Sequence, residues 1–600
     1  MIKNPINKLL RWSGWRVVAA ELPFCFAIGV VSFVLVMDLF LHAGRSITFD
    51  GRVHSTTIAQ FSQMIADKSF PLGWSSGWSV YGFPLALYAH QLTSYLGAAI
   101  NFIVHDPQLA YNYMYLLGAI SSGVVFYCFI RLFTGKWSSY AASVLFTFAP
   151  YRIVNIYTRG ALPEFFVTTF LILCLFGLTL LARKRTLSGF ITLVVGVVGV
   201  CLTHPMMLIP LGVLVILYGI YVLVQSIHSS SILPLRRGGS LFPSSLISTL
   251  YSLFSHSFVV LTLLAGLIGL LISSYYIIPL RLDIKYVHYG LEKNHIRLNQ
   301  APTLEQLLSP DWLYFGPYHP GPPSENFKIG VIEVGVLLCG VFLLLQKKKK
   351  GGLLTTWLII SLISIALSLH SSEWLYTHIA FLGNIQYPWR MLSATIIAIP
   401  VVAALVFEEI LNESMEKGRE WSAIVFAFIV LLARVPAAYG KNYLVQPPDA
   451  YFYVQPNLHT ANLTTIWMDD VLSYPSKDHQ ADIIAGQGSI TSEQVREQSR
   501  TYTIQATSQL RLIDYTFYYP GWHAYVDGVE TPIEFQDYSH KGVITYSVPS
   551  GTHTVELKFK PTKLRWVSYG LSVIGVLAFL GIASWLYSNE RRRFNQSPDC

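Results

Sequence analysis

The segment Phe49–His54 brings together three side chains that could carry out chemistry. Asp50 supplies a carboxylate, Arg52 a guanidinium and His54 an imidazole, directly after the first long apolar stretch. A carboxylate can take the proton of an acceptor group, and cations can stabilise an anionic leaving group. Asp50 is therefore the candidate catalytic residue, with His54 in a supporting role. The alternative for Asp50 is structural, as the N-cap of a helix that starts near Gly51.

Ionisable residues in short turns between apolar stretches form a second set of candidates. Arg159 and Glu164 bracket one such turn, where they either form a mutual ion pair or contact an anionic substrate. His204, between Thr203 and Pro205, either contributes to the same pocket or satisfies backbone groups at a helix break. Because ionisable groups are costly to place at such positions, each of them is a functional hypothesis.

Arg390 stands where an apolar stretch begins, in the motif Gln386-Tyr387-Pro388-Trp389-Arg390. On the topology given below it lies on the external side, where arginine is disfavoured. An arginine in that position needs a counter-ion, and a lipid phosphate suits the bidentate guanidinium. Gln386 and Trp389 are then candidate substrate contacts.

Aromatic residues near the predicted external surface have two interpretations. Trp74, Trp78 and Trp389 fit the aromatic belt of a membrane interface. Aromatic faces also contact sugars, so Trp74 and Tyr81 are further candidate substrate contacts. No metal-binding signature with defined spacing occurs, and Asp50 with His54 four residues later is only a weak indication of one. A divalent metal is thus not supported by a motif, and no cofactor is assigned.

The composition predicts the elements that must position these residues. Hydrophobic residues make up 53% of the 600 residues, charged residues 12%, and the mean hydropathy is +0.46. These values are typical of polytopic α-helical membrane proteins. Apolar runs long enough to cross about 30 Å of hydrocarbon recur along the chain. We predict about twelve spans, near 17–42, 110–132, 138–157, 162–182, 188–203, 205–224, 256–279, 329–346, 353–370, 391–409, 420–437 and 566–587.

Clusters of lysine and arginine set the predicted orientation, because cytoplasmic loops are enriched in them. The net charge of +9 is thus mainly a topology signal, and cations dispersed in this way argue against nucleic-acid binding. We interpret the first span as a retained helix, and the external segments contain no cysteine for a disulfide framework. Twelve spans with both termini in the cytoplasm place all basic clusters inside: residues 3–16, 131–136, 183–185, 236–237, 347–350, 417–419 and 591–593.

Two external segments are long enough to hold structure of their own. In the external loop 43–109, the apolar stretch 86–104 carries His90, Gln91 and Tyr95 and suggests a helix at the membrane interface. In 438–565 the residues from Arg500 onward alternate with the period of a strand, so we predict a small external β-sandwich. The predicted domains are a multi-span domain at 1–437, a β-rich domain at 438–565, and a final span with cytoplasmic tail at 566–600.

Two shorter features complete the layout. Residues 230–245, rich in Gly, Ser and Pro, predict a flexible cytoplasmic loop. Asn462-Leu463-Thr464 matches the pattern of a glycosylation acceptor, whose meaning depends on the organism. There is no internal repeat.

The layout resembles the C-type (GT-C) superfamily of membrane glycosyltransferases, which combine an acidic first external loop, many spans and a terminal external domain. Within it the chain resembles bacterial and archaeal membrane proteins labelled 6-pyruvoyl-tetrahydropterin synthase related, although nothing in it resembles the soluble pterin enzyme. The segment Tyr518–Gly528, followed by Val548–His553, resembles the end of the bacterial family that glycosylates lipoteichoic acid. The motifs that carry the resemblance to the pterin-related label are Phe49-Asp50-Gly51 with His54, Trp74-Ser75, Tyr81-Gly82-Phe83-Pro84, Arg159-Gly160-Ala161 with Glu164, and Gln386-Tyr387-Pro388-Trp389-Arg390.

The resemblance implies transfer of a sugar from a polyprenyl-phosphate or polyprenyl-diphosphate donor to a cell-envelope glycan, glycolipid or protein on the outer face of the cell membrane. An acidic residue of the first external loop is then the base or orients the acceptor, and Asp50 occupies that place. A second acidic residue beside Asp50 would support a metal ion, but Gly51 follows Asp50 here. This departure disfavours a metal-dependent mechanism. Arg159 and Arg390 are assigned to the departing phosphate. The residues assigned to shaping the donor pocket are His54, Glu164 and His204.

Two other functions would use the same residues. A transporter of lipid-linked glycans would hold a phosphate with the same cations, but it should place charged residues along a path at mid-membrane. Here the predicted charges gather at one surface. A non-catalytic envelope protein would bind glycan through its β domain, and Asp50 would then lie away from any cavity.

Overall fold

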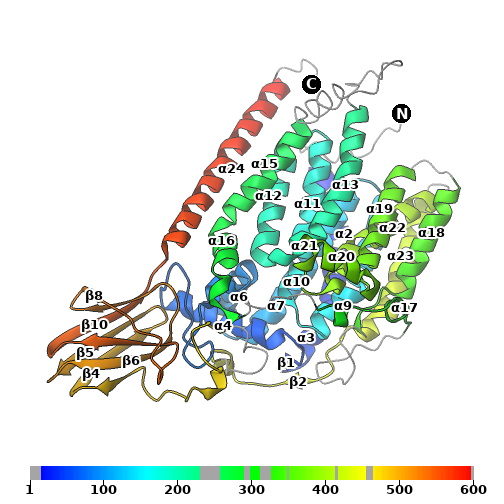
Figure 1. Ribbon diagram of the computed structural model, residues 1–600. Coiled ribbons are helices and arrows are strands. Elements are labelled where there is room, and N and C mark those ends of the chain that lie inside the picture. The colour runs from blue at the N-terminus through cyan, green and yellow to red at the C-terminus, as the bar shows by residue number, and fades with distance from the viewer. Residues whose placement is uncertain are drawn as a thin grey trace.

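A helical bundle with a β domain beside one of its ends makes up the protein, as a computed structural model shows (Figure 1). The structure describes residues 15–229, 257–288, 297–310, 326–346, 351–411, 416–453 and 464–595. The loop predicted at 230–245, the sequon asparagine Asn462 and the basic residues 3–11, 236–237 and 347–350 lie outside the described residues.

Nine candidate spans are present in the described part of the chain, each long and apolar enough to cross a membrane. Each coincides with one of the apolar runs predicted from the sequence. Three of them begin with a short helix that continues into a longer one. They are α2 (Trp15–Val36), α7 (Pro107–Ile130), α10 (Leu162–Phe166) with α11 (Thr168–Ala182), α12 (Thr186–Thr203), η1 (Pro205–Met207) with α13 (Leu208–Ser229), α19 (Gly351–Ser368), η7 (Pro388–Met391) with α22 (Leu392–Leu411), α23 (Glu416–Arg434) and α24 (Lys563–Asn595).

The other three predicted spans are helical but are not single straight helices of full length. The run 138–157 divides into α8 (Lys136–Thr147) and α9 (Pro150–Tyr157), because a proline lacks the amide that would continue the first helix. The run 256–279 divides into α15 (Ser257–Ile272) and α16 (Ser274–Leu282), bent by 68°. The run 329–346 gives α18 (Val331–Leu345), only 15 residues long. Mean hydropathy depends only on which residues a run contains, so it does not indicate where a helix is broken.

The loop 43–109, predicted to be external and called the first external loop here, is largely helical. Its apolar stretch forms the expected helix, α6 (Gln91–Val104), which packs against α4 (Gly51–Ala66) and α7. A short antiparallel pair, β1 (Arg45–Ser46) with β2 (Tyr443–Leu444), joins the loop to the segment that follows α23. The remaining short helices are α3 (Asp38–Leu41), α5 (Leu85–Tyr88), η2 (Ile284–Tyr286), η4 (Leu298–Gln300), α17 (Leu304–Leu308), η6 (His370–Ser372), α20 (Glu373–His378), α21 (Ala380–Gly383), η8 (Val435–Ala437), η9 (Pro448–Tyr451) and η10 (Val471–Ser473).

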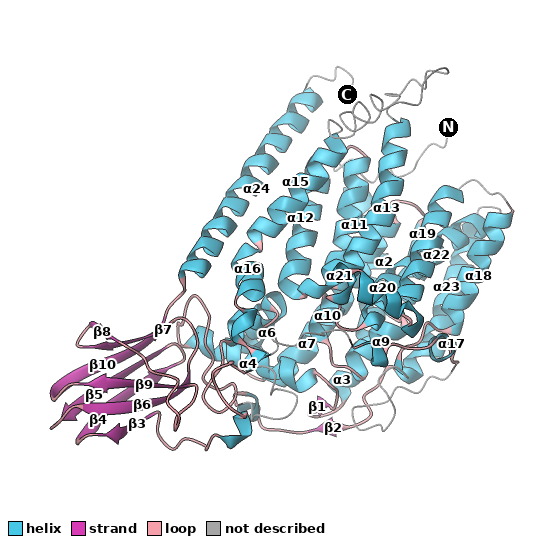
Figure 2. Ribbon diagram, viewed as in Figure 1, coloured by secondary structure: helices cyan, strands magenta, loops and turns pink. Residues whose placement is uncertain are grey.

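The β domain consists of two antiparallel sheets (Figure 2). Alternate residues of β5 point into the core, with Tyr502 and Ile504 fully buried, as the period of two predicts. The turn between β7 and β8 uses Asp527 and Gly528 at positive φ, which is the geometry of a tight hairpin. One sheet has the order β4 (Gly488–Arg496), β5 (Ser499–Ala506), β10 (Gly551–Phe559), β7 (Trp522–Val526), β8 (Val529–Thr531); the other has β3 (Ala481–Ala485), β6 (Leu510–Phe517), β9 (Val543–Val548).

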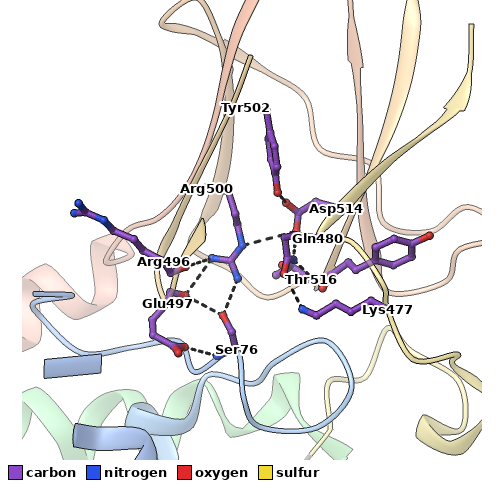
Figure 3. A network of polar contacts seen from close by, with 10 residues as sticks. Ser76, Lys477, Gln480, Arg496, Glu497, Arg500, Tyr502, Asp514 and Thr516 are labelled. Atoms are coloured by element: carbon purple, nitrogen blue, oxygen red, sulfur yellow. Dashed lines mark hydrogen bonds and ion pairs between the residues drawn. The ribbon is translucent and has the colours of Figure 1, made fainter. Parts of the chain in front are cut away.

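A buried polar network attaches the first external loop to the β domain (Figure 3). Arg500 of β5 donates from Nη2 to Oγ of Ser76 at 2.8 Å and from Nη1 to two backbone carbonyls of the β4–β5 turn. The carboxylate of Glu497 accepts from the backbone N–H of Ser76. Asp514 of β6 lies 3.9 Å from Nε of Arg500 and accepts from the hydroxyl of Tyr502. The loop is therefore held at a fixed position on the β domain.

Basic residues gather at the other end of the bundle. Arg131 follows the last turn of α7 and pairs with Glu21 of α2 at 2.9 Å. Tyr111, in the first turns of α7, donates to the carbonyl of Gly160 in the turn that contains Arg159. Because a helix rises about 1.5 Å per residue, roughly 30 Å separates these two levels. The charge rule assigns the basic end to the cytoplasm, which stays a prediction.

Candidate functional site

Asp50 lies at the start of α4, against the turn that contains Arg159. Its backbone N–H donates to the carbonyl of Arg159 at 2.7 Å, and Phe49 makes a similar bond to Thr158. Asp50 occupies the N-cap position, but its side chain does not cap the helix; Oγ1 of Thr48 accepts from the N–H of Gly51 instead. The Asp50 carboxylate therefore does not cap the helix, which was the structural alternative to a catalytic role.

Two glycines allow this close approach. Gly160 has a φ of +66°, and a Cβ there would lie 2.2 Å from Oγ1 of Thr48 and 2.7 Å from the backbone nitrogen of Gly51. Gly51 is similarly crowded, since its Cβ would meet Oγ1 of Thr48 at 2.4 Å. Tyr111 from α7 donates to the carbonyl of Gly160 at 3.0 Å and fixes the turn from behind. Neither position has room for a side chain.

Glu164 binds both predicted arginines at once. Its Oε1 lies 2.8 Å from Nη1 of Arg159, and its Oε2 lies 3.1 Å from Nε of Arg390. The local ion pair with Arg159 is therefore formed, and the counter-ion of Arg390 in this structure is Glu164, where the sequence suggested a lipid phosphate. All three side chains are buried, with Glu164 at 1% exposure. The carboxylate of Glu164 in α10 thereby contacts an arginine that is 226 positions away in the sequence.

Residues that sequence reasoning missed complete the arginine contacts. Tyr151 donates its hydroxyl to Glu164, and Asn155 accepts from Nη1 of Arg159 at 2.8 Å. Both lie in α9, and the spacing 151, 155, 159 places them on one face of a helical path that ends at Arg159. That four-residue spacing of polar groups in an apolar segment was the available signal. Burial lowers the pKa of Arg159, but the neighbouring Glu164 carboxylate raises it by more. The pKa of Arg159 is therefore above its usual value.

Three histidine rings lie beside the ion pairs. The ring centres of His54 and His90 are 5.9 Å apart, and those of His90 and His204 are 4.7 Å apart. Burial, assisted by the neighbouring basic groups, lowers the pKa of His54 and of His90 to about 3 and the pKa of His204 well below its usual value. All three rings are therefore neutral near pH 7. His90 was visible in the sequence only as a polar residue in an apolar stretch.

Two of these rings carry nitrogen atoms whose bonding is incomplete. Nδ1 of His90 and Nδ1 of His204 are buried and make no hydrogen bond to any described residue. His204 caps the end of α12 through its backbone, as the helix-break alternative expects, but its ring is not used for that purpose. Buried polar atoms of this kind are uncommon and mark a place where a ligand can bond.

The remaining predicted contacts divide into two groups. Gln386, at a φ of +67°, accepts from Nη1 of Arg390 at 2.9 Å, and Trp389 stacks between Tyr387 and Phe327 at 4.3 and 4.4 Å. These two residues belong to the arginine site. The structure does not bring Trp74 and Tyr81 to it.

Trp74 and Tyr81 pack instead against the β domain. Trp74 is fully buried and meets Trp522 edge-on at 5.4 Å. Tyr81, 3% exposed, contacts Tyr515 and Phe517 of β6. Their aromatic faces are covered by protein, so in this arrangement they hold the loop on the β domain and offer no surface to a sugar.

The site can bind an anion and activate a hydroxyl. The single carboxylate of Glu164 pairs directly with both guanidinium groups in a buried setting, and Asp50 at the adjacent helix start also raises the pKa of Arg159 by its charge. In low dielectric, guanidinium groups interact strongly with a phosphate. Within the described ranges, no three His, Cys, Asp or Glu side chains are grouped so as to hold a metal ion.

The sequence of this protein matches the model of a known family. A sequence model described as "6-pyruvoyl-tetrahydropterin synthase related domain; membrane protein" matches residues 88–439. The chain belongs to this family. The matched part of this pterin-synthase-related membrane protein contains Arg159, Glu164, His204 and Arg390, together with His90. Membership of this family, together with the long apolar helices, identifies the protein as a multi-pass membrane protein.

A relative of this family member occurs in Lactococcus lactis subsp. cremoris (strain MG1363), an uncharacterized protein that is 24% identical over 208 residues. The match spans 33% of each of the two chains. The relation is therefore local, and it brings no activity with it.

Three solved structures show partial likeness to this family member. The mycobacterial arabinofuranosyltransferase AftD has a TM-score of 0.41 and 14% identity over 69% of this chain and 26% of its own. The oligosaccharyltransferase of Archaeoglobus fulgidus gives 0.36 and 13% over 73% of this chain and 57% of its own in the apo form. The same archaeal enzyme, AglB, with an inhibitory peptide and a dolichol-phosphate gives 0.39 and 13% over 74% and 57%.

Proposed function

We propose that this protein is a membrane glycosyltransferase that moves a sugar from a polyprenyl-phosphate-linked donor to an acceptor at the end of the bundle that carries the β domain. One observation carries the proposal: two buried arginines share Glu164 in direct contact with the helix start that holds Asp50. The motifs that resemble the GT-C superfamily support the same class of reaction. We place this end of the bundle on the outer face of the cell membrane, in agreement with the charge rule.

The donor phosphate is assigned to Arg159 and Arg390. Guanidinium groups bind phosphate oxygens in pairs, and Glu164 orients both groups. His90 and His204, neutral and incompletely bonded, add hydrogen-bonding capacity without adding charge. Gln386 holds Arg390 through a hydrogen bond, and Trp389 stacks on Tyr387, whose ring lies 5.1 Å from the guanidinium of Arg390.

The transfer step is assigned to Asp50. Its carboxylate accepts the proton of the acceptor hydroxyl while that oxygen forms a bond to the anomeric carbon of the sugar. The bond between this carbon and the phosphate oxygen breaks, and its electron pair leaves with the polyprenyl phosphate. Arg159 and Arg390 stabilise the charge that develops there. Asp50 is partly exposed, so an acceptor can approach it from outside the bundle.

The test uses the purified full chain in lipid nanodiscs with radiolabelled polyprenyl-phosphate sugars and a cell-envelope fraction as acceptor. We expect label to enter the acceptor fraction and polyprenyl phosphate to be released. Asp50→Asn should reduce both rates by about 10²- to 10⁴-fold, because the base is lost while the shape is kept. Asp469→Asn, at an exposed β-domain carboxylate paired with Lys541, is the matched control and should transfer at the wild-type rate.

Two outcomes contradict the proposal. Wild-type transfer by Asp50→Asn removes Asp50 from the mechanism. Movement of the intact lipid-linked sugar across a liposome bilayer, with no release of polyprenyl phosphate, identifies a transporter instead.

A further inference from the structure

A second ligand site lies apart from the arginines. A cavity of about 510 Å³ opens between the loop after α4, the helices α5 and α6, the bent helix α16 and the final helix α24. Its volume is within the range of pockets that bind small ligands. Aromatic and aliphatic side chains form most of the wall, including Tyr95 of α6, Tyr275 of α16 and Tyr569 of α24.

The mouth of the cavity has the character of a membrane interface. Phe70 and Trp566 line it and remain 84% and 63% exposed. Large exposed aromatic residues at the end of a membrane helix are typical of the level where headgroups meet hydrocarbon. Trp566 lies in the first turn of α24, where this helix leaves the β domain (Figure 1). A chain could therefore enter sideways from the membrane.

One lining residue adjoins the candidate site in the chain. Gln91, the first residue of α6, lines the cavity, and His90 precedes it directly. The ring of His90 contacts that of His54, which lies one helical turn beyond Asp50. A lipid whose chain fills the cavity would thus carry its polar group toward the proposed base.

The polarity of the wall selects an uncharged lipid. None of the described residues that line the cavity bears a charge; its polar groups are amide and hydroxyl groups such as Gln91 and Ser572. Arg390, in contrast, contacts Met206 and Ile385, beside α13 and α21. In Figure 1 these elements lie on the right of α12, whereas α16 and α24 lie on its left. The residues that line the cavity include none of Arg159, Glu164 and Arg390.

We propose that this cavity holds the apolar chain of an uncharged, hydroxyl-bearing membrane lipid that accepts the sugar. The acceptor role rests on the proposed function; the lipid site does not. In the reaction the lipid hydroxyl loses its proton to Asp50 and its oxygen bonds to the anomeric carbon. The phosphate of the polyprenyl donor leaves with the electron pair of the broken carbon–oxygen bond. The product is a glycolipid.

Photolabelling of the full chain in nanodiscs tests the lipid site. The probe is a diacylglycerol with a diazirine in one acyl chain, and the labelled peptides are read by mass spectrometry. We expect label in the peptides with Tyr275–Pro279 and Trp566–Ser572, removed by excess unlabelled diacylglycerol. Ala86→Phe, at a wall residue that is 5% exposed, should fill the cavity and reduce the label at least about 10-fold. Ala86→Leu, with a smaller side chain, should reduce it less and serves if the phenylalanine variant does not fold.

Gly570→Phe is the matched control on the same helix. A Cβ at Gly570 meets nothing within 4 Å, so this variant adds the same ring outside the cavity. Equal labelling in Ala86→Phe, Ala86→Leu and Gly570→Phe would mean that the probe reports only surrounding lipid, and the site would be rejected. Labelling of the same peptides by a diazirine-bearing polyprenyl phosphate, removed by unlabelled polyprenyl phosphate, would assign the cavity to the donor and overturn the proposal.

Sugar transfer separates the lipid site from the acceptor role. With diacylglycerol as acceptor, Ala86→Phe should raise the apparent KM for diacylglycerol at least about 10-fold and leave the KM for the donor unchanged. If the wild-type chain transfers no sugar in any assay while cavity labelling persists, the lipid site stands and both the acceptor role and the proposed function fail. If it transfers sugar to other acceptors but not to diacylglycerol, only the acceptor role fails.

Discussion

Two buried arginine clusters in this molecule are built in different ways. In the β-domain network, Arg500 lies beside Asp514 and Lys477 donates to Gln480, and most of the residues are fixed on or beside strands (Figure 3). In the candidate site, Arg159 and Arg390 share the single carboxylate of Glu164, and the residues come from turns and helix ends. The carboxylates of Glu497 and Asp514 each bond within the protein in the first cluster, whereas two guanidinium groups share one carboxylate in the second.

The difference teaches how to separate a structural ion network from a binding site. Burial alone does not separate them, because Arg500 is 1% exposed and Arg390 7%. The sharing of one carboxylate by two arginines, beside two histidine nitrogens that make no hydrogen bond to a described residue, does separate them.

The largest difference between the two clusters is expected when one arginine is removed from each. Arg390→Met should reduce sugar transfer per folded molecule by about 10²- to 10³-fold, since it removes charge at the leaving phosphate. Arg500→Met should leave that rate unchanged but lower the free energy of unfolding by about 3–5 kcal/mol, because the buried carboxylate of Asp514 loses its partner. Transfer rates normalised to folded protein, together with thermal unfolding, measure both. A similar loss of transfer in the two variants would erase the distinction.

Anion rescue sharpens the same contrast. Glu164→Gln leaves two buried arginines without a carboxylate and should cost about 3 kcal/mol of stability. Inorganic phosphate at about 100 times its Kd should restore about 2.7 kcal/mol, because it binds the folded state alone. Asp514→Asn is the control, since it removes a carboxylate of equal burial from the β-domain network, where no anion site is proposed. Equal rescue of both variants would show a general salt effect.

Acid should destabilise the candidate site and not the β-domain surface. The pKa of His54 and of His90 is lowered to about 3, so between about pH 6.5 and pH 3 the unfolded chain binds protons that the folded chain does not. The free energy of unfolding should therefore fall with decreasing pH, by up to about 1.4 kcal/mol per pH unit for each ring. Denaturant unfolding at pH 7.5, 6 and 5 measures the slope, and His90→Phe should make it shallower.

For the exposed His553 of the β domain, the pKa shift and its effect on stability have the opposite sign. Its hydrogen bond to Asp527 raises the pKa of the imidazole. Any stability that it contributes is present below about pH 6.5 and is lost as the pH rises through the raised pKa. Replacement of His553 by Phe should therefore leave the acid slope below pH 6 unchanged, and a slope reduced as much as in His90→Phe would contradict the assignment of that slope to the site.

The smallest effect is expected from the aromatic contact between the loop and the β domain. A double-mutant cycle of Trp74→Leu and Trp522→Leu should give a coupling energy of about 0.5–1.5 kcal/mol beyond the two separate losses. Transfer per folded molecule should stay within about twofold in all three variants. A selective loss of transfer in Trp74→Leu would return this residue to the substrate contacts.

The sequence was informative where the signal is local. Arg159 and Glu164 are five positions apart, and their ion pair was one of two stated alternatives. The strand period in 499–506 and the glycine turns at 528 and 551 also follow from local rules, and the structure contains them. Apolar runs predicted helices correctly, but a count of spans required knowledge of breaks such as that between α8 and α9.

The remaining features depend on contacts between distant segments. The partner of Arg390 is Glu164, and nothing near Arg390 in the sequence identifies it. Trp74 and Tyr81 looked like sugar platforms because an aromatic residue in a polar loop has the same appearance whether it faces a ligand or a strand. His90 entered the site only because α6 folds back beside the end of α12.

The contact between Gly51 and Gly160 has a consequence for how this site can change during evolution. Because any side chain at Gly160 would meet Thr48 and the amide of Gly51, the segment with Asp50 and the segment with Arg159 are constrained to change together. A descendant that lost the glycine would have to move one segment away and would separate the Asp50 carboxylate from the Arg159 guanidinium. The pair of glycines therefore gives a simple sequence criterion for finding family members in which these two side chains can still lie close together.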